Sequence, residues 1–344
     1  MGIIRNKATV TRNDVARACG VSGALVSYAF SDTAQNKVKP ETREKILLAA
    51  RKLGYRPSLI GRCLKNNCSY NVCILLPERF VSAMSLHQLR IFHGVCMAIQ
   101  ETEYRPMVFF GVNEKLFKTL EENRVDGIIV LDSANDLSYA DKLLDYQIPL
   151  VFANVEYRSD SPLIASVRSD HEKLVRDRIA DLVKNNCKNI LQVSACGSLC
   201  QPNYILKQEF EKVQKQYAAE NIRFHDMTFR QYDVTDDLRL KAETFFSGDT
   251  PCDGVLVDGG CFADMIVEAA QRHGIKLERN RNCFVSCSQE ANFPNWSHNP
   301  FRLGCQAWES MQNMLNGQKV EKLKLIPYFL AENEKDLEDN SRID

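Results

Sequence analysis

The stretch TRNDVARACGVSGALVSYAF, residues 11–30, predicts two short helices separated by a tight turn. Thr11 is a favourable N-cap residue, and Asp14, three residues on, is an acid in the first turn, where it stabilises a helix. Apolar residues follow at helical spacing until Gly20, a residue suited to end a helix. The first helix is therefore predicted over Arg12–Cys19.

A second helix follows the Gly20-Val21 turn. Ser22 is a typical N-cap, and four apolar residues come after it at helical spacing: Leu25, Val26, Ala29 and Phe30. Residues 40–44, Pro-Glu-Thr-Arg-Glu, then open a third helix that ends at Gly54. Two short helices joined by a Gly-Val-Ser turn, with a third that closes a small core, predict a helix-turn-helix unit.

Positive charge is concentrated in this part of the chain. Residues 1–68 carry thirteen Lys and Arg against four Asp and Glu, a net charge of +9. The whole chain is neutral, so residues 69–344 carry −9. A basic head on an acidic body indicates a module that binds a polyanion, joined to a domain with another task. A surface that is basic for no functional reason is the alternative.

Length and composition exclude several classes of protein. With 344 residues and 44% hydrophobic residues, the chain is long enough for two or three domains with sizeable cores. Its longest apolar runs are far shorter than the ~18 residues of a membrane helix, and no secretory signal begins the chain. We therefore expect a cytoplasmic protein with no membrane partner.

The thirteen cysteines and six histidines show no pattern that predicts a metal site. No Cys-x-x-Cys pair occurs, and the histidines have no metal-binding spacing, so we expect reduced thiols, no zinc and no disulfide framework. The sequence also lacks a Gly-x-Ser-x-Gly motif, a phosphate loop and a dinucleotide fingerprint. We therefore expect neither an enzyme nor a bound cofactor.

Several different short motifs occur along the chain at characteristic spacings. In the head they are residues 14–22 (DVARACGVS), Val26-Ser27, residues 41–46 (ETREKI) and residues 53–57 (LGYRP). In the body they are residues 124–129 (RVDGII), residues 148–151 (IPLV), and Pro300 with Leu303-Gly304 and Ala307. Together they resemble the LacI/GalR family of transcriptional regulators, over nearly the whole chain and more weakly after residue 170. The resemblance implies a homodimer that binds a palindromic operator in double-stranded DNA. We expect a repressor, and an activator is the alternative.

The resemblance implies that the second helix enters the major groove with its N-terminal side chains at base edges. Where the family usually has polar residues and then an arginine, this helix has Gly23, Ala24 and later Tyr28. Because tyrosine lacks the bidentate grip of arginine on guanine, we expect weaker base discrimination. A head that no longer binds DNA is the alternative. The residues expected to contact DNA are Thr11, Ser22, Gly23, Ala24, Leu25, Ser27, Tyr28, Lys37, Tyr55, Ser58, Gly61 and Leu64.

Residues 57–69 resemble the hinge helix of the family. In relatives this segment folds on DNA, and a leucine pair from two subunits wedges into the minor groove and kinks the duplex. Leu64 matches that leucine, Gly61 takes a small-residue position, and Ser58 stands where Asn is usual. A flexible linker, indicated by Asn66, Asn67 and Ser69, is the alternative.

From Tyr70 onward, short apolar strands alternate with amphipathic helices. Eight strand-like runs are predicted, at residues 72–76, 107–110, 127–131, 150–153, 164–167, 190–193, 255–257 and 283–286. This alternation predicts an α/β body of two doubly wound parallel-sheet lobes, like a periplasmic binding protein. We expect a head over residues 1–56, a hinge over 57–69 and a body over 70–344. The expected lobes are residues 70–165 plus 295–318, and residues 166–294 plus 319–335.

An effector would bind between the lobes, at the carboxyl ends of the strands. Sugar- and purine-responding relatives clamp their ligand with an arginine, an Asn-Asp pair and an aspartate, whereas the matching positions here are Leu206, Gly259-Gly260 and Ser288. We therefore expect an effector other than a free hexose or purine base, and its identity stays open. Residues that would line the cleft, or that are ordinary loop polarity, are Arg79, Asp132, Asn154, Leu206, Asp258, Ser288 and Gln289.

Two other functions fit the same scaffold. One is a small-molecule binding protein whose head has lost operator recognition. The other is a thiol-based redox sensor, since the chain has thirteen cysteines.

Overall fold

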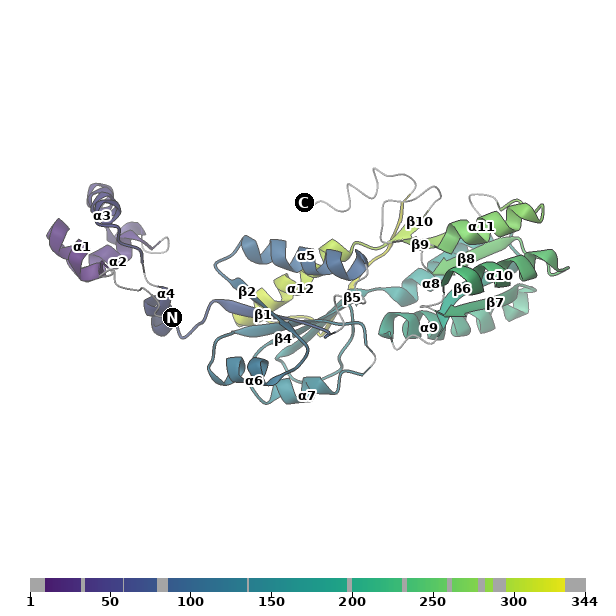
Figure 1. Cartoon of the computed structure of the whole chain (residues 1–344), viewed down its shortest axis with the longest axis horizontal. Coiled ribbons are helices and arrows are strands. Elements are labelled where there is room, and N and C mark those ends of the chain that lie inside the picture. The colour runs from purple at the N-terminus through teal and green to yellow at the C-terminus, as the bar shows by residue number, and fades with distance from the viewer. Residues whose placement is uncertain are drawn as a thin grey trace, which may run out of the picture. The chain divides into compact units, whose positions relative to one another are not determined.

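The computed structural model describes residues 10–31, 35–57, 59–78, 86–134, 136–196, 200–230, 234–258, 262–277, 282–286 and 295–331. It divides into two compact units, residues 1–68 and 69–344 (Figure 1), and each is described by itself. Among the described residues, no helix is long and apolar enough to cross a membrane.

The first unit begins with α1 (Arg12–Cys19), which has a complete capping box. The Thr11 hydroxyl accepts a hydrogen bond from the Asp14 backbone N–H, and the Asp14 carboxylate accepts one from the Thr11 N–H at 2.9 Å. The helix ends at Gly20, whose φ of 67° is in the left-handed region that favours glycine. The sequence-based bounds of this helix are confirmed.

Two further helices complete the core of this unit. Ser22 caps α2 (Gly23–Ala29), and α3 (Pro40–Leu53) starts at a proline and ends at Gly54, with a short 3₁₀ turn, η1 (Gln35–Lys37), before it. The buried core consists of Val15, Ala16, Cys19, Val26, Ala29, Ile46 and Ala50. These helices are the predicted helix-turn-helix unit. A fourth helix, α4 (Leu59–Asn66), lies within the predicted hinge segment.

The first sheet of the second unit is parallel throughout, in the order β11-β5-β4-β3-β1-β2. Its strands are β1 (Asn71–Leu76), β2 (Arg105–Phe110), β3 (Gly127–Leu131), β4 (Leu150–Ala153), β5 (Ile164–Ser169) and β11 (Leu323–Ile326). Helices α5 (Leu86–Gln100) and α12 (Pro300–Leu315) cover one face, and α6 (Glu114–Glu121) and α7 (Tyr139–Leu144) cover the other (Figure 1).

Two glycines let α5 and α12 pack closely. A Cβ on Gly94 would lie 2.1 Å from the Phe301 carbonyl oxygen, and one on Gly304 would lie 2.1 Å from that of Ile91. These distances are too short for any side chain, so the Leu303-Gly304 motif has a packing reason in this chain.

The second sheet has the order β12-β10-β9-β8-β6-β7, parallel except for β12. Its strands are β6 (Asn189–Cys196), β7 (Arg223–Arg230), β8 (Gly254–Asp258), β9 (Asn282–Ser286), β10 (Asn295–Ser297) and β12 (Phe329–Ala331). Its helices are α8 (His171–Lys184), α9 (Gln201–Tyr217) with the 3₁₀ turn η2 (Ala218–Glu220), α10 (Val234–Ser247) and α11 (Ala263–Arg272). The predicted α/β body with two lobes is confirmed.

The chain crosses between the sheets three times, after β5, after β10 and after β11. All three crossings lie later than the sequence predicts. At the first crossing, β5 pairs with β4 and with β11, which keeps residues 166–169 in the first lobe. Residues 323–326 also belong to the first sheet, and residues 295–297 belong to the second. The crossings bring residues that are distant in sequence to one place.

Candidate functional site

The exposed edge of α2 is held by a contact from α1. The Arg12 guanidinium donates a hydrogen bond to the Ser27 hydroxyl at 3.3 Å, and that hydroxyl donates to the Gly23 carbonyl oxygen at 3.2 Å. Gly23 leaves room for this approach, since a Cβ there would lie 3.0 Å from Arg12 Nε. Ala24 and Ser27 are exposed. The first residue of α1 therefore places a cation beside the side chains that α2 presents to solvent.

The aromatic residues expected to contact DNA also have partners in the head. Lys37 Nζ lies 5.0 Å from the centre of the Tyr28 ring, a cation–π arrangement. Tyr55 packs edge-on against Phe30, with ring centres 5.6 Å apart. Leu25 is half-buried at the edge of the core, and Thr11 and Ser22 act as helix caps.

Helix α4 presents its leucine to solvent. Leu64 is 81% exposed. A Cβ on the exposed Gly61 would meet no atom within 4 Å, so the fold of the unit does not require a glycine there. Single exposed apolar residues are common on protein surfaces, so this exposure leaves Leu64 accessible to a partner without identifying one. Ser58 lies outside the described residues.

Two aspartates at strand ends in the body are engaged within their own lobes. The Asp132 carboxylate accepts hydrogen bonds from the backbone N–H groups of Ser133 (2.7 Å) and Ala134 (3.0 Å) and from the Tyr139 hydroxyl (2.8 Å). The Asp258 carboxylate accepts from Arg178 Nη1 at 2.7 Å and from Gln192 Nε2 at 2.9 Å. Both carboxylates thus already satisfy buried or backbone donors.

A stack of rings occupies the place where the chain crosses between the sheets. His87 stacks on His298 with ring centres 4.4 Å apart, and His298 stacks on Tyr328 at 5.1 Å. The Tyr328 hydroxyl and His171 Nδ1 share a hydrogen bond of 2.9 Å. The four residues come from α5, from the β10–α12 crossing, from the β11–β12 crossing and from the start of α8. We call these four residues, His87, His171, His298 and Tyr328, the ring stack.

Asn154 and Ser169 hold two of the imidazoles in place. His87 Nε2 lies 3.0 Å from Asn154 Oδ1, and His298 Nδ1 lies 3.3 Å from the Ser169 hydroxyl. Asn154 is 4% exposed and has a φ of 75°, in the left-handed region. Of the candidate cleft residues that the structure describes, Asn154 is thus the one with a hydrogen bond to the ring stack.

The imidazoles of the ring stack are held in the neutral form. Burial lowers the pKa of His171 to about 3, and the positive charge of Arg168 acts in the same direction. Burial also lowers the pKa of His87 and lowers that of His298 still further, with Arg90 contributing to both shifts. The carboxylate of Glu172 opposes the shift at His171 but does not outweigh it.

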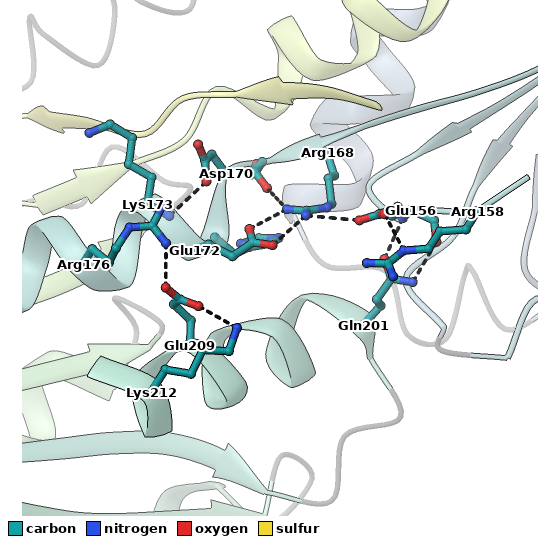
Figure 2. Close-up of polar contacts among 12 residues, drawn as sticks. Glu156, Arg158, Arg168, Asp170, Glu172, Lys173, Arg176, Gln201, Glu209 and Lys212 are labelled. Atoms are coloured by element: carbon teal, nitrogen blue, oxygen red, sulfur yellow. Dashed lines mark hydrogen bonds and ion pairs between the residues drawn. The ribbon is translucent and has the colours of Figure 1, made fainter. Parts of the chain in front are cut away.

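Polar contacts next to the stack bind the two lobes to each other (Figure 2). Arg168, near the end of β5, lies between Glu172 and Glu156, donating to Glu172 through both terminal nitrogens at 2.8 Å and to Glu156 at 3.2 Å. Burial acts to raise the pKa of Glu172, but the bonds from Arg168 outweigh it and the pKa is lowered. The buried guanidinium is therefore fully charged and paired.

Gln201, the first residue of α9, fastens the second lobe to the first. Its side-chain oxygen accepts from the Glu156 N–H at 2.6 Å, and its amide nitrogen donates to the Glu156 carbonyl oxygen at 3.0 Å. Its own backbone N–H donates to the Ser133 carbonyl oxygen at 2.7 Å, beside an antiparallel bridge between Ala134 and Cys200. We call these contacts of Cys200 and Gln201 the inter-lobe clasp.

The comparisons with known proteins agree with this architecture. A family model described as bacterial regulatory proteins, lacI family, matches residues 7–58. Catabolite control protein A of Priestia megaterium is 26% identical over 281 residues, 78% of this chain and 79% of that protein. The HTH-type transcriptional regulator MalR of Streptococcus pneumoniae is 22% identical over 327 residues, 91% of this chain and 95% of that protein. The N-terminal head is therefore a LacI-family helix-turn-helix domain, and the relatives of the chain are LacI-family regulators.

Solved LacI-family structures share the fold over most of the chain. The Lac repressor bound to ONPG in the repressed state matches with a TM-score of 0.70 at 16% identity, covering 95% of this chain and 99% of that one. The relatives are regulators and not enzymes. A chain with a LacI-family head and these relatives is accordingly a DNA-binding transcriptional regulator.

One candidate cleft residue of the body lies in a core instead. Leu206 is 9% exposed and packs with Leu174, Phe210 and Val213 between α8 and α9, because its spacing of four and seven residues from Phe210 and Val213 puts all three on one helix face. The candidates Arg79, Ser288 and Gln289, and the Gly259-Gly260 pair, lie outside the described residues.

The ring stack, the inter-lobe clasp and Arg12 were not predicted. Their members come from positions far apart in sequence, such as 87, 171, 298 and 328, and no local pattern connects them. Arg12 is different, because the sequence predicts both its place in the first turn of α1 and a DNA contact at Ser27. Those two predictions together could have suggested that Arg12 lies near the DNA. In the described part of the chain, no group of three or more His, Cys, Asp or Glu side chains is arranged to hold a metal ion.

Proposed function

We propose that this LacI-family protein is a homodimeric repressor that binds a palindromic operator and acts in the cytoplasm. The observation that carries the proposal is the exposed edge of α2, where Ala24 and Ser27 stand beside the Arg12 cation on a head of net charge +9. A structure with the same fold, the Lac repressor dimer bound to operator, supports it with a TM-score of 0.67.

The side chains on this edge divide into two roles. Ala24 and the Tyr28 ring offer apolar contact to thymine methyl groups, whereas Ser27 offers one hydroxyl to a base edge. Arg12, at the N-terminus of α1, is placed to bind a phosphate or a guanine near the same base pairs. We propose that Arg12 supplies part of the grip that an arginine on α2 supplies in relatives.

The hinge segment contributes through Leu64. An exposed leucine loses water contact when it enters the minor groove, and the unstacking that it causes is offset by a bent duplex that meets more of the protein. Because two subunits would place two such residues at the centre of the site, we propose that the operator is kinked at its centre.

We propose that an effector in the body sets the operator affinity by changing how the lobes are held. The inter-lobe clasp and the two bonds from Arg168 to Glu172 join parts of the two lobes, so a ligand that prefers one lobe arrangement shifts the population by its difference in affinity. The aspartates at the strand ends, Asp132 and Asp258, already have partners, which favours an effector with few hydroxyl groups.

Selection of duplexes from a random library by the full chain tests the proposal. We expect a palindrome with two half-sites, and affinity for it should fall ~10³–10⁵-fold between 50 and 200 mM salt if roughly 6–10 phosphates are contacted. Binding that barely changes with salt, or no enrichment of any sequence, would contradict operator recognition. The second of these outcomes would favour a small-molecule binding protein whose head has lost its operator.

A further inference from the structure

The end of α4 brings two cysteines together. Asn67, just beyond the helix, has a φ of 48°, and the Cys68 N–H donates a hydrogen bond of 3.3 Å to the Cys63 carbonyl oxygen. A left-handed residue with this bond across it is a Schellman motif. In such a motif the side chains at the two bonded positions characteristically contact each other, and here both are cysteines.

The backbone geometry suits a disulfide. Disulfides span about 4.4–6.8 Å between Cα atoms, and the 3.3 Å bond from the Cys68 N–H to the Cys63 carbonyl oxygen leaves only a few bond lengths between the two Cα atoms. Both cysteines are thiols in the structure and both are partly exposed, so an oxidant reaches them. The Schellman bond therefore keeps the backbones of the two cysteines close enough for a cross-link between their side chains.

Other cysteines of the chain are poorly suited to the same chemistry. Cys19, Cys73 and Cys187 are buried. Burial raises the pKa of the Cys73 thiol to about 12 and, for the partly buried Cys252, also to about 12, so these sulfurs stay protonated. Since the thiolate is the reactive form, the accessible pair at the end of α4 is favoured.

We infer that Cys63 and Cys68 form a peroxide-sensitive dithiol that closes into an intramolecular disulfide across the last turn of α4. One thiolate attacks an oxygen of hydrogen peroxide, the O–O bond breaks, and hydroxide leaves to give a sulfenic acid. The second thiol attacks that sulfur, the S–O bond breaks, and water leaves. In total two thiols and one peroxide give one disulfide and two waters, and the sulfurs lose the two electrons that the peroxide gains.

The cross-link would act on DNA binding through Leu64, which lies inside the closed loop. A disulfide formed in the geometry of the folded turn removes conformations from the unfolded segment, so α4 needs less ordering when it binds. This step rests on the proposed operator binding, and with it we expect roughly threefold to tenfold tighter binding to the operator after oxidation.

Peptide mapping of the reduced full chain after treatment with hydrogen peroxide tests the dithiol without DNA. After alkylation of the remaining thiols and cleavage with trypsin, we expect peptides 63–65 and 66–79 to be joined, lighter by two hydrogens than their sum. Because peptide 66–79 also holds Cys73, the assignment depends on C63S and C68S, each of which should abolish the joined species. The chain should keep its monomer mass on a non-reducing gel.

Two variants at Asn67 separate the Schellman geometry from mere closeness in sequence. Asn67→Val, a β-branched residue that resists positive φ, should slow disulfide formation roughly fivefold, whereas Asn67→Gly should keep the rate. Equal rates in both variants, no joined peptide, or a disulfide only between two chains would overturn the inference. If the disulfide forms but operator affinity does not change, the dithiol stands and its link to DNA binding fails.

Discussion

Arg12 donates a hydrogen bond to Ser27 at 3.3 Å, which couples the first residue of α1 to the exposed edge of α2. The contact costs Arg12 little of its reach, because the residue is exposed and one bond uses one of its five donors. A guanidinium held beside α2 is in position to meet DNA wherever α2 does.

Replacing Arg12 by alanine should weaken operator binding about tenfold and lower the slope of log affinity against log salt by about 1, as expected for one lost phosphate contact. Fluorescence anisotropy with a labelled operator at several salt concentrations measures both. The matched control is Arg239→Ala, which removes the same charge from an exposed position on α10 of the body. If both variants change affinity equally, Arg12 acts only through net charge.

Leu64→Ala should reduce operator bending and weaken specific binding while leaving non-specific binding and the fold nearly intact. The reason is that an alanine is too short to wedge between base steps, whereas the phosphate contacts of the head stay in place. Bending is measured by energy transfer between dyes at the two ends of the operator. Leu48→Ala is the control, since Leu48 is a 52% exposed leucine on α3 outside the hinge. An unchanged bend would assign residues 57–69 to a linker.

The helices of the head were predictable because their ends depend on local chemistry. Thr11 and Ser22 cap the first two helices, and Gly20 and Gly54 end the first and third, so a few side chains determine each boundary. Central strands such as β3 and β4 were also predicted at their observed bounds, since both of their faces are buried and their sequences are continuously apolar.

Other elements could not be predicted because they lack a local apolar pattern or depend on distant parts of the chain. The edge strand β7 contains five polar or charged residues in RFHDMTFR, counting its histidine, and shows no apolar run. Strands β10 and β12 have three residues each, too few for a pattern. The ring stack depends on three chain crossings, and the role of Leu206 was misjudged because its match to a family arginine was weighed above its place on the buried face of α9.

Asp258 balances a buried charge, and its removal should destabilise the second lobe. The Arg178 side chain is 2% exposed and the Asp258 side chain 15% exposed. Asp258→Ala leaves the guanidinium without its carboxylate, so we expect the free energy of unfolding to fall by about 3 kcal/mol. Asp258→Asn keeps a hydrogen-bond acceptor and should cost less. Urea unfolding followed by circular dichroism measures both. If the alanine variant were as stable as the wild type, the fold would not depend on the Arg178–Asp258 pair, and the prediction would be wrong.

Acid should destabilise the body through the ring stack. In the folded state the pKa of each histidine of the ring stack is lowered from 6.5, and that of His171 is about 3. Below pH 6.5 these histidines therefore bind protons in the unfolded chain but stay neutral in the folded chain. The free energy of unfolding therefore falls as pH drops below 6.5, by up to about 1.4 kcal/mol per pH unit for each histidine that stays neutral, and for His171 the fall continues to about pH 3. The charged groups that face the stack are Arg90, Arg168 and Glu172.

Urea unfolding at pH 7.5, 6.5, 6.0 and 5.5 would show this dependence. His298→Phe keeps a ring between His87 and Tyr328 but cannot be protonated, so the slope with pH should become shallower. His273→Gln is the control, because His273 is an exposed residue that pairs with Glu243 outside the stack. A slope that both variants reduce equally, or neither reduces, would show that the acid sensitivity arises elsewhere.

Free hexoses, pentoses and purine bases should not bind the body with micromolar affinity. A polyhydroxylated sugar needs several fixed donors and acceptors, since each hydroxyl taken from water and left unpaired costs about 1–3 kcal/mol. In this chain Asp132 is occupied by Tyr139 and two backbone N–H groups, Asp258 by Arg178 and Gln192, and the side chain of Gln201 by the Glu156 backbone. A sugar would have to replace these contacts before it formed its own.

Isothermal titration calorimetry of the full chain with each compound measures this affinity, and Gln201→Ala, which removes part of the inter-lobe clasp, is the comparison. If any compound binds the wild-type chain at micromolar concentration and also changes its operator affinity, the polar groups at the strand ends are open to ligands after all, and the prediction is wrong. If binding appears only in the Gln201→Ala variant, the clasp is what excludes sugars from the wild-type body.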